Sequence, residues 1–206
     1  MDFPPAVVPP DDARGFVRPA AFFLAILFAL VCVVTGARAD DVAVPPKLQA
    51  ELLGKVAGYD KNLAGRAGDK VHVLIVQKAG DESSASIAAH MQRELQGLAD
   101  IGGLPHDEAI TGWTTGETLA QTIKTSKIAI VYFSSGFRDD VDAIARALGG
   151  LDVLSAGAIA DYVPKGVVLG FDLVSGKPKL LCNLPQAKKQ NVAFRSEVLK
   201  LMKVFE

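Results

Sequence analysis

Few residues of this sequence have the type and spacing that a catalytic or metal site needs. His72, His90 and His106 stand in a predicted strand, a helix and a loop, none with a second ligand at metal spacing. In His106-Asp107-Glu108, three adjacent residues cannot all point at one ion from regular structure, so we expect a solvated loop. No nucleophile elbow, P-loop, CxxC, HExxH or dinucleotide-binding glycine pattern occurs. The residue types favour a binding or regulatory module without metal or cofactor, and an enzyme of unrecognised type remains the alternative.

Two serine-containing segments are the candidates for ligand binding. Ser83 and Ser84 follow one predicted strand, and Ser134, Ser135 and Gly136 follow another. Open α/β sheets bind ligands outside the carboxyl ends of their strands, and helix N-termini attract anions. If both segments lie at the same end of the sheet, their hydroxyls could cradle a small anion. The alternative is a turn that only satisfies free backbone groups before the next helix.

Trp113 and Phe137 are the two aromatic residues expected in loops. Exposed aromatic side chains often anchor a protein partner, so both are candidate partner-binding residues. The alternative is that they face the core. If either side chain is exposed, its predicted role is protein–protein contact and not catalysis.

The first 39 residues have the pattern of a signal peptide. Arg14 and Arg18 precede an uncharged apolar run at residues 20–34, and an Ala-Arg-Ala tripeptide ends at Ala39. This run is shorter than the roughly 20 residues that a transmembrane helix needs. We expect cleavage after Ala39 and export from the cytoplasm, with an uncleaved N-terminal anchor as the alternative.

Cleavage would remove Cys32 and leave Cys182 without a partner in its own chain. We expect Cys182 to be a buried apolar filler, because nothing basic lies beside it in sequence to lower its pKa. An exposed, redox-responsive thiol is the alternative. The net charge of −1 gives no electrostatic footprint for nucleic acid.

Residues 40–46 are predicted to be a linker and residues 47–206 a single α/β domain. Strands expected at residues 71–76, 128–133 and 153–155 alternate with helices, which predicts parallel βαβ units. Residues 167–173 and 179–182 flank a tight turn and predict an antiparallel hairpin. The predicted fold is a three-layer α/β sandwich with a mostly parallel sheet of about five or six strands, ending in this hairpin and a C-terminal helix.

Amphipathic spacing predicts the helices between these strands and the residues that cap them. Asp139 and Asn183 are the expected caps of the helices that follow them, and Ser83 or Ser84 of an earlier helix. The apolar faces expected are Leu48, Leu52, Val56, Tyr59 and Leu63 in the first helix, Leu119 and Ile123 in a later one, and Val192, Val198, Leu201, Met202 and Phe205 in the last.

The C-terminal third resembles the YfiR-like family of periplasmic regulatory proteins. The resemblance lies in the order of strand hairpin, Asn183-Leu184 pair, Ala187-Lys188 step and a helical segment at residues 194–201. It implies a periplasmic regulator that binds the exposed sensor region of an inner-membrane diguanylate cyclase and restrains cyclic-di-GMP synthesis. No catalysis is implied. A homodimer remains open, and a periplasmic small-ligand-binding protein that uses the loops at the strand ends is the alternative.

Overall fold

The computed structural model of the protein describes residues 42–206. The predicted signal peptide and the first two residues of the predicted linker lie outside this range. Within it, Val44 is buried, and no helix of residues 42–206 is both long and apolar enough to span a bilayer.

The centre of the fold is one seven-stranded sheet in the order β2-β1-β3-β4-β5-β6-β7. All neighbouring strands are parallel except β5 and β6, which form an antiparallel hairpin. The strands are β1 (Val71–Gln77), β2 (His106–Gly112), β3 (Ile130–Phe133), β4 (Leu154–Gly157), β5 (Leu169–Val174), β6 (Lys177–Asn183) and β7 (Met202–Phe205). The predicted α/β class with a mostly parallel sheet and an antiparallel hairpin is confirmed, with seven strands in place of five or six.

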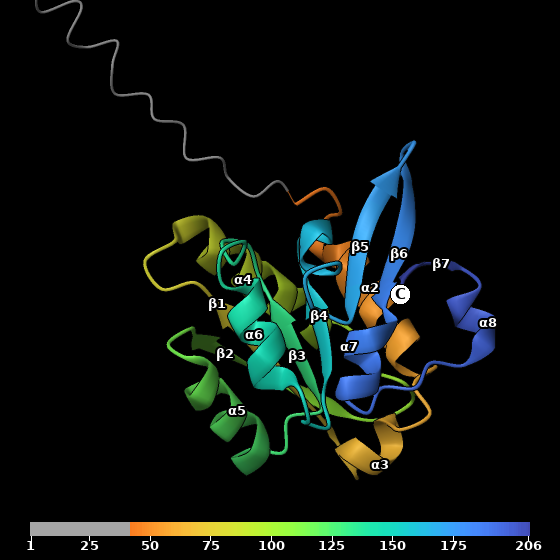
Figure 1. Ribbon diagram of the computed structural model, residues 1–206, viewed down its shortest axis with the longest axis horizontal. Coiled ribbons are helices and arrows are strands. Elements are labelled where there is room, and N and C mark those ends of the chain that lie inside the picture. Colours follow the sequence, from red (N-terminus) through yellow and green to blue (C-terminus); the bar gives the residue numbers. More distant parts are fainter. Residues whose placement is uncertain (1–41) are drawn as a thin grey trace, which may run out of the picture. The chain divides into compact units, whose positions relative to one another are not determined.

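Helices cover both faces of the sheet (Figure 1). Helices α2 (Pro46–Ala57) and α4 (Glu82–Gln96) pack together on one face, and α5 (Gly116–Thr125) and α6 (Val141–Leu148) on the other. Between these helix layers, every residue of β3 and β4 is buried, as expected for a parallel sheet with both faces covered. Leu119 and Ile123 of α5 are buried as predicted.

The face predicted for the first helix is buried only in part: Val56 and Leu63 are buried, and Leu48 and Leu52 are half-buried against the core. Ala50, Leu53, Val56 and Ala57 enter the core, whereas Tyr59 lies beyond the helix and is exposed. The buried stripe also contains a polar residue, Gln49. Its amide donates to the carbonyl oxygens of residues 44 and 158 and accepts from the Tyr132 hydroxyl at 2.8 Å. A fully paired amide costs little to bury, so a purely apolar spacing pattern could not locate this face.

Two predicted helix caps are wrong. The cap of α4 is Asp81, whose carboxylate accepts from the Ser84 N–H at 3.0 Å, and not Ser83 or Ser84. At α6 the residue in the cap position is Asp140, one residue after the predicted Asp139. Its carboxylate makes no capping bond, because it pairs with the Lys78 ammonium.

The C-terminal region contains a strand that the sequence pattern did not reveal. The hairpin turn at Ser175 and Gly176 has positive φ at both residues (52° and 73°), which is the geometry of a two-residue hairpin. Asn183 then caps α7 (Leu184–Lys189), as predicted. The chain continues through the short α8 (Ser196–Leu199) into β7, so Met202 and Phe205 belong to a strand and not to the predicted helix face.

Cys182 lies in β6 and is completely buried, with a free thiol. Burial in apolar surroundings raises the pKa of this thiol to about 12. The predicted apolar-filler role is therefore consistent with its position.

Candidate functional site

The carboxyl ends of β1 and β3 are the position at which an open α/β sheet of this topology binds ligands. From β1 the chain passes to β2 on one side and then returns to β3 on the other. The loops that leave β1 and β3 therefore diverge, which in this strand order leaves a crevice between them. The predicted ligand-binding segments follow these two strands, and the structure brings them together.

Their hydroxyl groups are used within the protein. The Ser84 and Ser134 Oγ atoms lie 2.6 Å apart, and Ser134 also donates to the Val76 carbonyl oxygen at 3.0 Å. Ser84 Oγ accepts from the Lys78 N–H and lies 2.8 Å from the Ser135 carbonyl oxygen. Ser84 and Ser134 are completely buried. These two serines thus join the β1 and β3 loops to each other.

Charged side chains and a glycine lie at the outer side of the crevice between the β1 and β3 loops. The Lys78 ammonium pairs with Asp140 and lies 5.8 Å from the centre of the Phe137 ring. Gly136 has a φ of +89°, and a Cβ there would lie 2.7 Å from an Asp81 carboxylate oxygen. Only glycine fits both this conformation and this close approach. The loops are therefore packed against each other, in agreement with the alternative of a turn that satisfies free backbone groups and not with an open anion cradle.

Two predicted ligand residues remain outside this network. Ser83 is exposed on the first turn of α4. The Ser135 hydroxyl is buried and has no hydrogen-bond partner among the described residues. Unpaired buried hydroxyls are uncommon, because an unmade hydrogen bond costs about 1–3 kcal/mol.

The two predicted partner-binding aromatics have different environments. Phe137 is completely buried, with Phe133 and Trp113 packed edge-on at 5.7 and 6.0 Å between ring centres. Its N–H donates to the Tyr162 hydroxyl oxygen at 2.9 Å. Phe137 is therefore a core residue, and its ring is not available to a partner. Trp113 is only partly buried and keeps part of its indole accessible.

Trp113 lines a groove of about 550 Å³ between the beginning of α5 and one face of α6. Thr115 caps α5 by accepting from the Thr118 N–H, and hydrogen bonds from the Glu117 backbone and the Thr115 hydroxyl lower the pKa of Glu117. Arg146 reaches this groove from α6 and has no ion pair within residues 42–206. Neither Thr115 nor Arg146 stands in a recognisable motif, so neither was predicted from the sequence to line a site.

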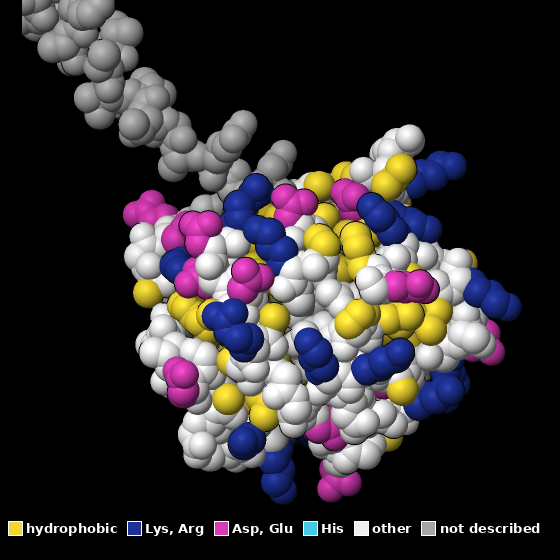
Figure 2. All heavy atoms as spheres, viewed as in Figure 1, with side chains coloured by type: hydrophobic (Ala, Val, Ile, Leu, Met, Phe, Trp, Pro, Cys, Tyr) yellow, Lys and Arg dark blue, Asp and Glu magenta, His cyan; other side chains and the backbone are white. Residues whose placement is uncertain are grey.

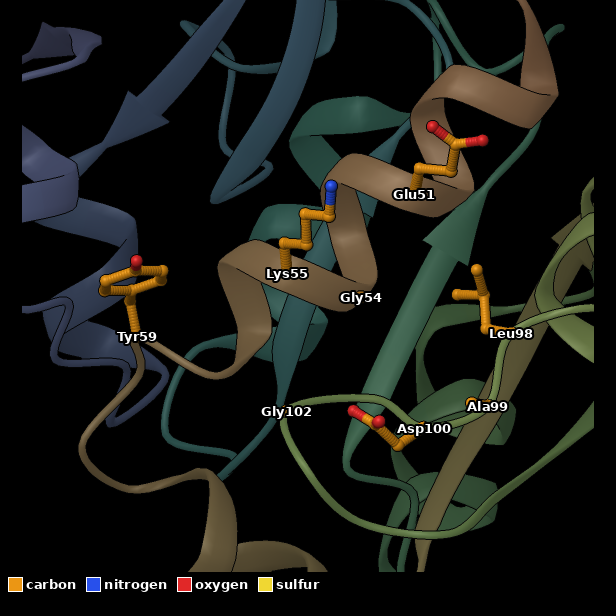
Figure 3. A pocket seen from close by; sticks show the side chains of 8 residues that line it. All are labelled: Glu51, Gly54, Lys55, Tyr59, Leu98, Ala99, Asp100 and Gly102. Atoms are coloured by element: carbon orange, nitrogen blue, oxygen red, sulfur yellow. The ribbon is translucent and has the colours of Figure 1, made fainter.

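A second cavity, of about 470 Å³, lies between α2 and the loop after α4 (Figure 3). Glu51, Lys55 and Tyr59 contribute a carboxylate, an amine and a phenol from the α2 side. The helix end and the loop approach so closely that a Cβ on Gly58 would lie 3.0 Å from the Cα of Gly102. None of the three polar side chains forms an ion pair within the described part of the chain.

His106 and Glu108 are not in a solvated loop as predicted. Both lie on the edge strand β2 and point to the same face, where the buried His106 Nδ1 atom contacts a carboxylate oxygen of the buried Glu108 side chain. The His106 Nε2 atom contacts the Leu98 carbonyl oxygen at 3.2 Å. On the opposite face, Asp107 accepts from His72 and Lys70, which lowers its pKa although partial burial opposes this. Across residues 42–206 no three such side chains are grouped as metal ligands.

Comparisons with known proteins support the sequence resemblance. Residues 113–203 match the family model described as DUF4154: YfiR/HmsC-like, which confirms the predicted likeness to a YfiR-like family. The matched segment begins at Trp113 and includes β3 to β6 and the beginning of β7. No curated protein matches the chain.

Solved structures with a similar fold come from several bacteria. A conserved domain protein from Vibrio cholerae O1 biovar El Tor is 14% identical, with a TM-score of 0.53 over 79% of this chain and 60% of that one. The ABC domain in complex with L-Trp from Streptococcus pneumonia is 10% identical (TM-score 0.55; 78% and 61%). CD0873, a substrate binding protein with adhesive properties from Clostridium difficile, is 12% identical (TM-score 0.54; 76% and 58%). The chain thus spans about 60% of the length of these structures, and the likeness concerns the fold alone.

Proposed function

We propose that this chain, whose residues 113–203 match the YfiR/HmsC-like family, is a periplasmic regulator of an inner-membrane diguanylate cyclase. It would bind the exposed sensor region of the cyclase and restrain cyclic-di-GMP synthesis. The family match is the observation that carries this proposal. It covers the part of the domain in which the sheet is completed by β4 to β7.

The packing of the loops at the carboxyl ends of β1 and β3 supports regulation by surface contact. The hydroxyls of Ser84 and Ser134, two of the candidate ligand residues, are bonded to each other and to backbone groups. The Lys78–Asp140 pair covers the same crevice. A protein of this kind would act mainly through what lies on its outer surface.

Deletion of the gene tests this function in the bacterium that encodes it. We expect intracellular cyclic-di-GMP and surface attachment to rise, because an inhibitory contact is lost. The full-length chain should restore the lower level. A variant without residues 1–39 should not, since it would stay in the cytoplasm, away from the sensor region. A deletion strain with unchanged cyclic-di-GMP would contradict the proposal.

A second candidate function is the binding of a small ligand in the groove beside Trp113. The observation that favours it is that Arg146, which has no ion pair within residues 42–206, lines this groove together with Trp113 and the beginning of α5. Such a groove suits a small anion with an apolar part. A ligand of this class should raise the melting temperature of the wild type and leave that of Arg146→Ala unchanged.

A further inference from the structure

The β5–β6 hairpin projects beyond the rest of the sheet. β4 pairs with β5 only at Leu169 and Gly170, and β7 pairs with β6 only from Leu180 onward. Residues 172–179, here called the hairpin arm, therefore form a two-stranded ribbon with no third strand on either side within the described chain (Figure 1). Isolated two-stranded ribbons are marginally stable in water, so an arm of this kind benefits from a contact.

One face of the hairpin arm is apolar. Leu173 pairs directly with Pro178, and paired residues of antiparallel strands point to the same face. This pair continues the face that carries the buried Phe171 and the partly buried Leu180. Leu173 is 37% exposed on this face, whereas Val174, which pairs with Lys177 beside the turn, points to the opposite face and is 54% exposed. The apolar face of the sheet thus runs out into solvent along the arm.

Of the other exposed large apolar residues, Leu201 contacts this arm and Tyr59 lies beside the segment before α8. Leu201, at 65% exposure, precedes β7, and its carbonyl oxygen accepts from Lys179 of the arm at 2.9 Å. Tyr59, at 43%, has its carbonyl oxygen bonded to the N–H of Arg195, just before α8. The four exposed large apolar side chains of residues 42–206 therefore all lie on or beside the C-terminal segment, residues 165–206.

This segment also differs from the rest of the domain in charge. Residues 165–206 contain eight Lys or Arg residues and three Asp or Glu residues, whereas residues 42–164 contain eleven and fifteen. Lys177 and Lys203 are exposed on the arm and on β7. Figure 2 shows hydrophobic side chains interspersed with Lys or Arg side chains over the half of the molecule where β5, β6 and α8 lie in Figure 1, and further Lys or Arg side chains over the other half. The surface is apolar and basic together.

We infer that the hairpin arm and the adjoining turn at Leu201 form the contact surface for the regulated protein, whose matching surface is acidic around an apolar depression. This rests on the proposed function. The apolar side chains would enter the depression and provide most of the binding free energy. The lysines would increase the association rate with an acidic partner and select against basic ones.

A protein partner fits these observations better than a membrane surface does. Only two large apolar side chains stand at the tip of the arm, and Asp172 lies directly opposite Lys179. Attachment to an anionic bilayer usually needs a tract of several adjacent basic residues or a long apolar helix face. The arm has neither. Its few apolar side chains and its lysines suit insertion into a pocket on a protein partner.

The test uses the purified protein and the purified periplasmic sensor domains of the diguanylate cyclases encoded in the same genome. Leu173→Ser with Val174→Ser should weaken binding to the recognised domain by about tenfold or more, without loss of folding. Lys177→Glu should weaken it and reduce its dependence on salt between about 50 and 300 mM. Lys124→Glu, a charge reversal on the exposed side of α5, and the conservative pair Leu173→Met with Val174→Ile should bind like the wild type.

The outcomes separate this inference from the proposed function. If no sensor domain binds the wild type, the proposed function fails and this inference fails with it. If a domain binds the wild type and all arm variants equally, the function stands and the contact surface lies elsewhere. Binding of the wild type to vesicles of phosphatidylglycerol and phosphatidylethanolamine in equal parts, lost in the arm variants, would overturn the inference in favour of a membrane surface. Restored binding of Lys177→Glu to a domain with one acidic residue changed to lysine would support it most strongly.

Discussion

At the scale of single residues, Cys182 gives the clearest prediction. Its thiol is completely buried in β6 and its pKa is raised to about 12, so the reactive thiolate is scarce at neutral pH. We expect a water-soluble alkylating reagent to modify Cys182 slowly in the folded protein and quickly after denaturation. Mass spectrometry of the labelled protein measures both rates.

Two substitutions separate the packing of this thiol from its chemistry. Cys182→Ser should lower the free energy of unfolding by about 1–3 kcal/mol, because a hydroxyl is buried without a good partner. Cys182→Ala removes the polar atom and should cost less. Fast labelling of the native protein, or a dimer on gels that disappears with reductant, would contradict the buried position and favour a thiol sensor.

The candidate ligand residues show how far single residues can be interpreted from sequence. The predicted anion cradle depended on both segments lying at the same end of the sheet, and the structure brings Ser84 and Ser134 together there. What the sequence could not show is that the Lys78–Asp140 pair, formed by residues 62 positions apart, closes the crevice over them. The sequence left open whether Phe137 faces the core, since its burial depends on Phe133 and Trp113 packing around it from different elements.

At the scale of secondary-structure elements, the strands with many β-branched residues were predictable, and the short C-terminal elements were not. The mostly apolar runs at residues 71–76 and 128–133, which contain most of β1 and all of β3, are long enough to indicate buried strands directly. β7 has only four residues, and their spacing also suited a helix. Its identity as a strand depends on pairing with β6, which is a tertiary contact.

Residues 59–62 and 191–195 are held together by a buried charge pair. Asp60 accepts from the Asn62 and Ala193 N–H groups and pairs with Arg66 at 2.8 Å. Both side chains are almost completely buried, whereas Asp152, which also contacts Arg66, is 48% exposed. This cluster joins the segment before α3 (Leu63–Ala67) to the segment before α8.

Asp60→Asn should lower the free energy of unfolding by about 3 kcal/mol, because it leaves a buried guanidinium without its main partner. Asp152→Asn is the matched control, since it removes the exposed partner of the same Arg66 and should cost less than about 1 kcal/mol. Urea unfolding followed by circular dichroism gives both values. Equal effects of the two substitutions would show that burial of the Asp60–Arg66 pair does not matter for stability.

At the scale of the whole molecule, the proposed function is contact with another protein. The family match covers the C-terminal half of the domain, and the same half carries the projecting hairpin arm and the excess of basic residues. The sequence alone contained the family resemblance and the charge pattern. It could not show that the exposed apolar residues lie on or beside residues 165–206, because this depends on the order of the strands in the sheet.

The most direct test of the central claim measures cyclase activity with the purified protein added. The full-length cyclase whose sensor domain binds this chain would be placed in nanodiscs, which leave both of its faces accessible. We predict that residues 40–206 of this chain lower the rate of cyclic-di-GMP synthesis in a saturable way, and that Leu173→Ser with Val174→Ser needs a higher concentration for the same effect. An unchanged rate of synthesis at a concentration that saturates the sensor domain would contradict the account.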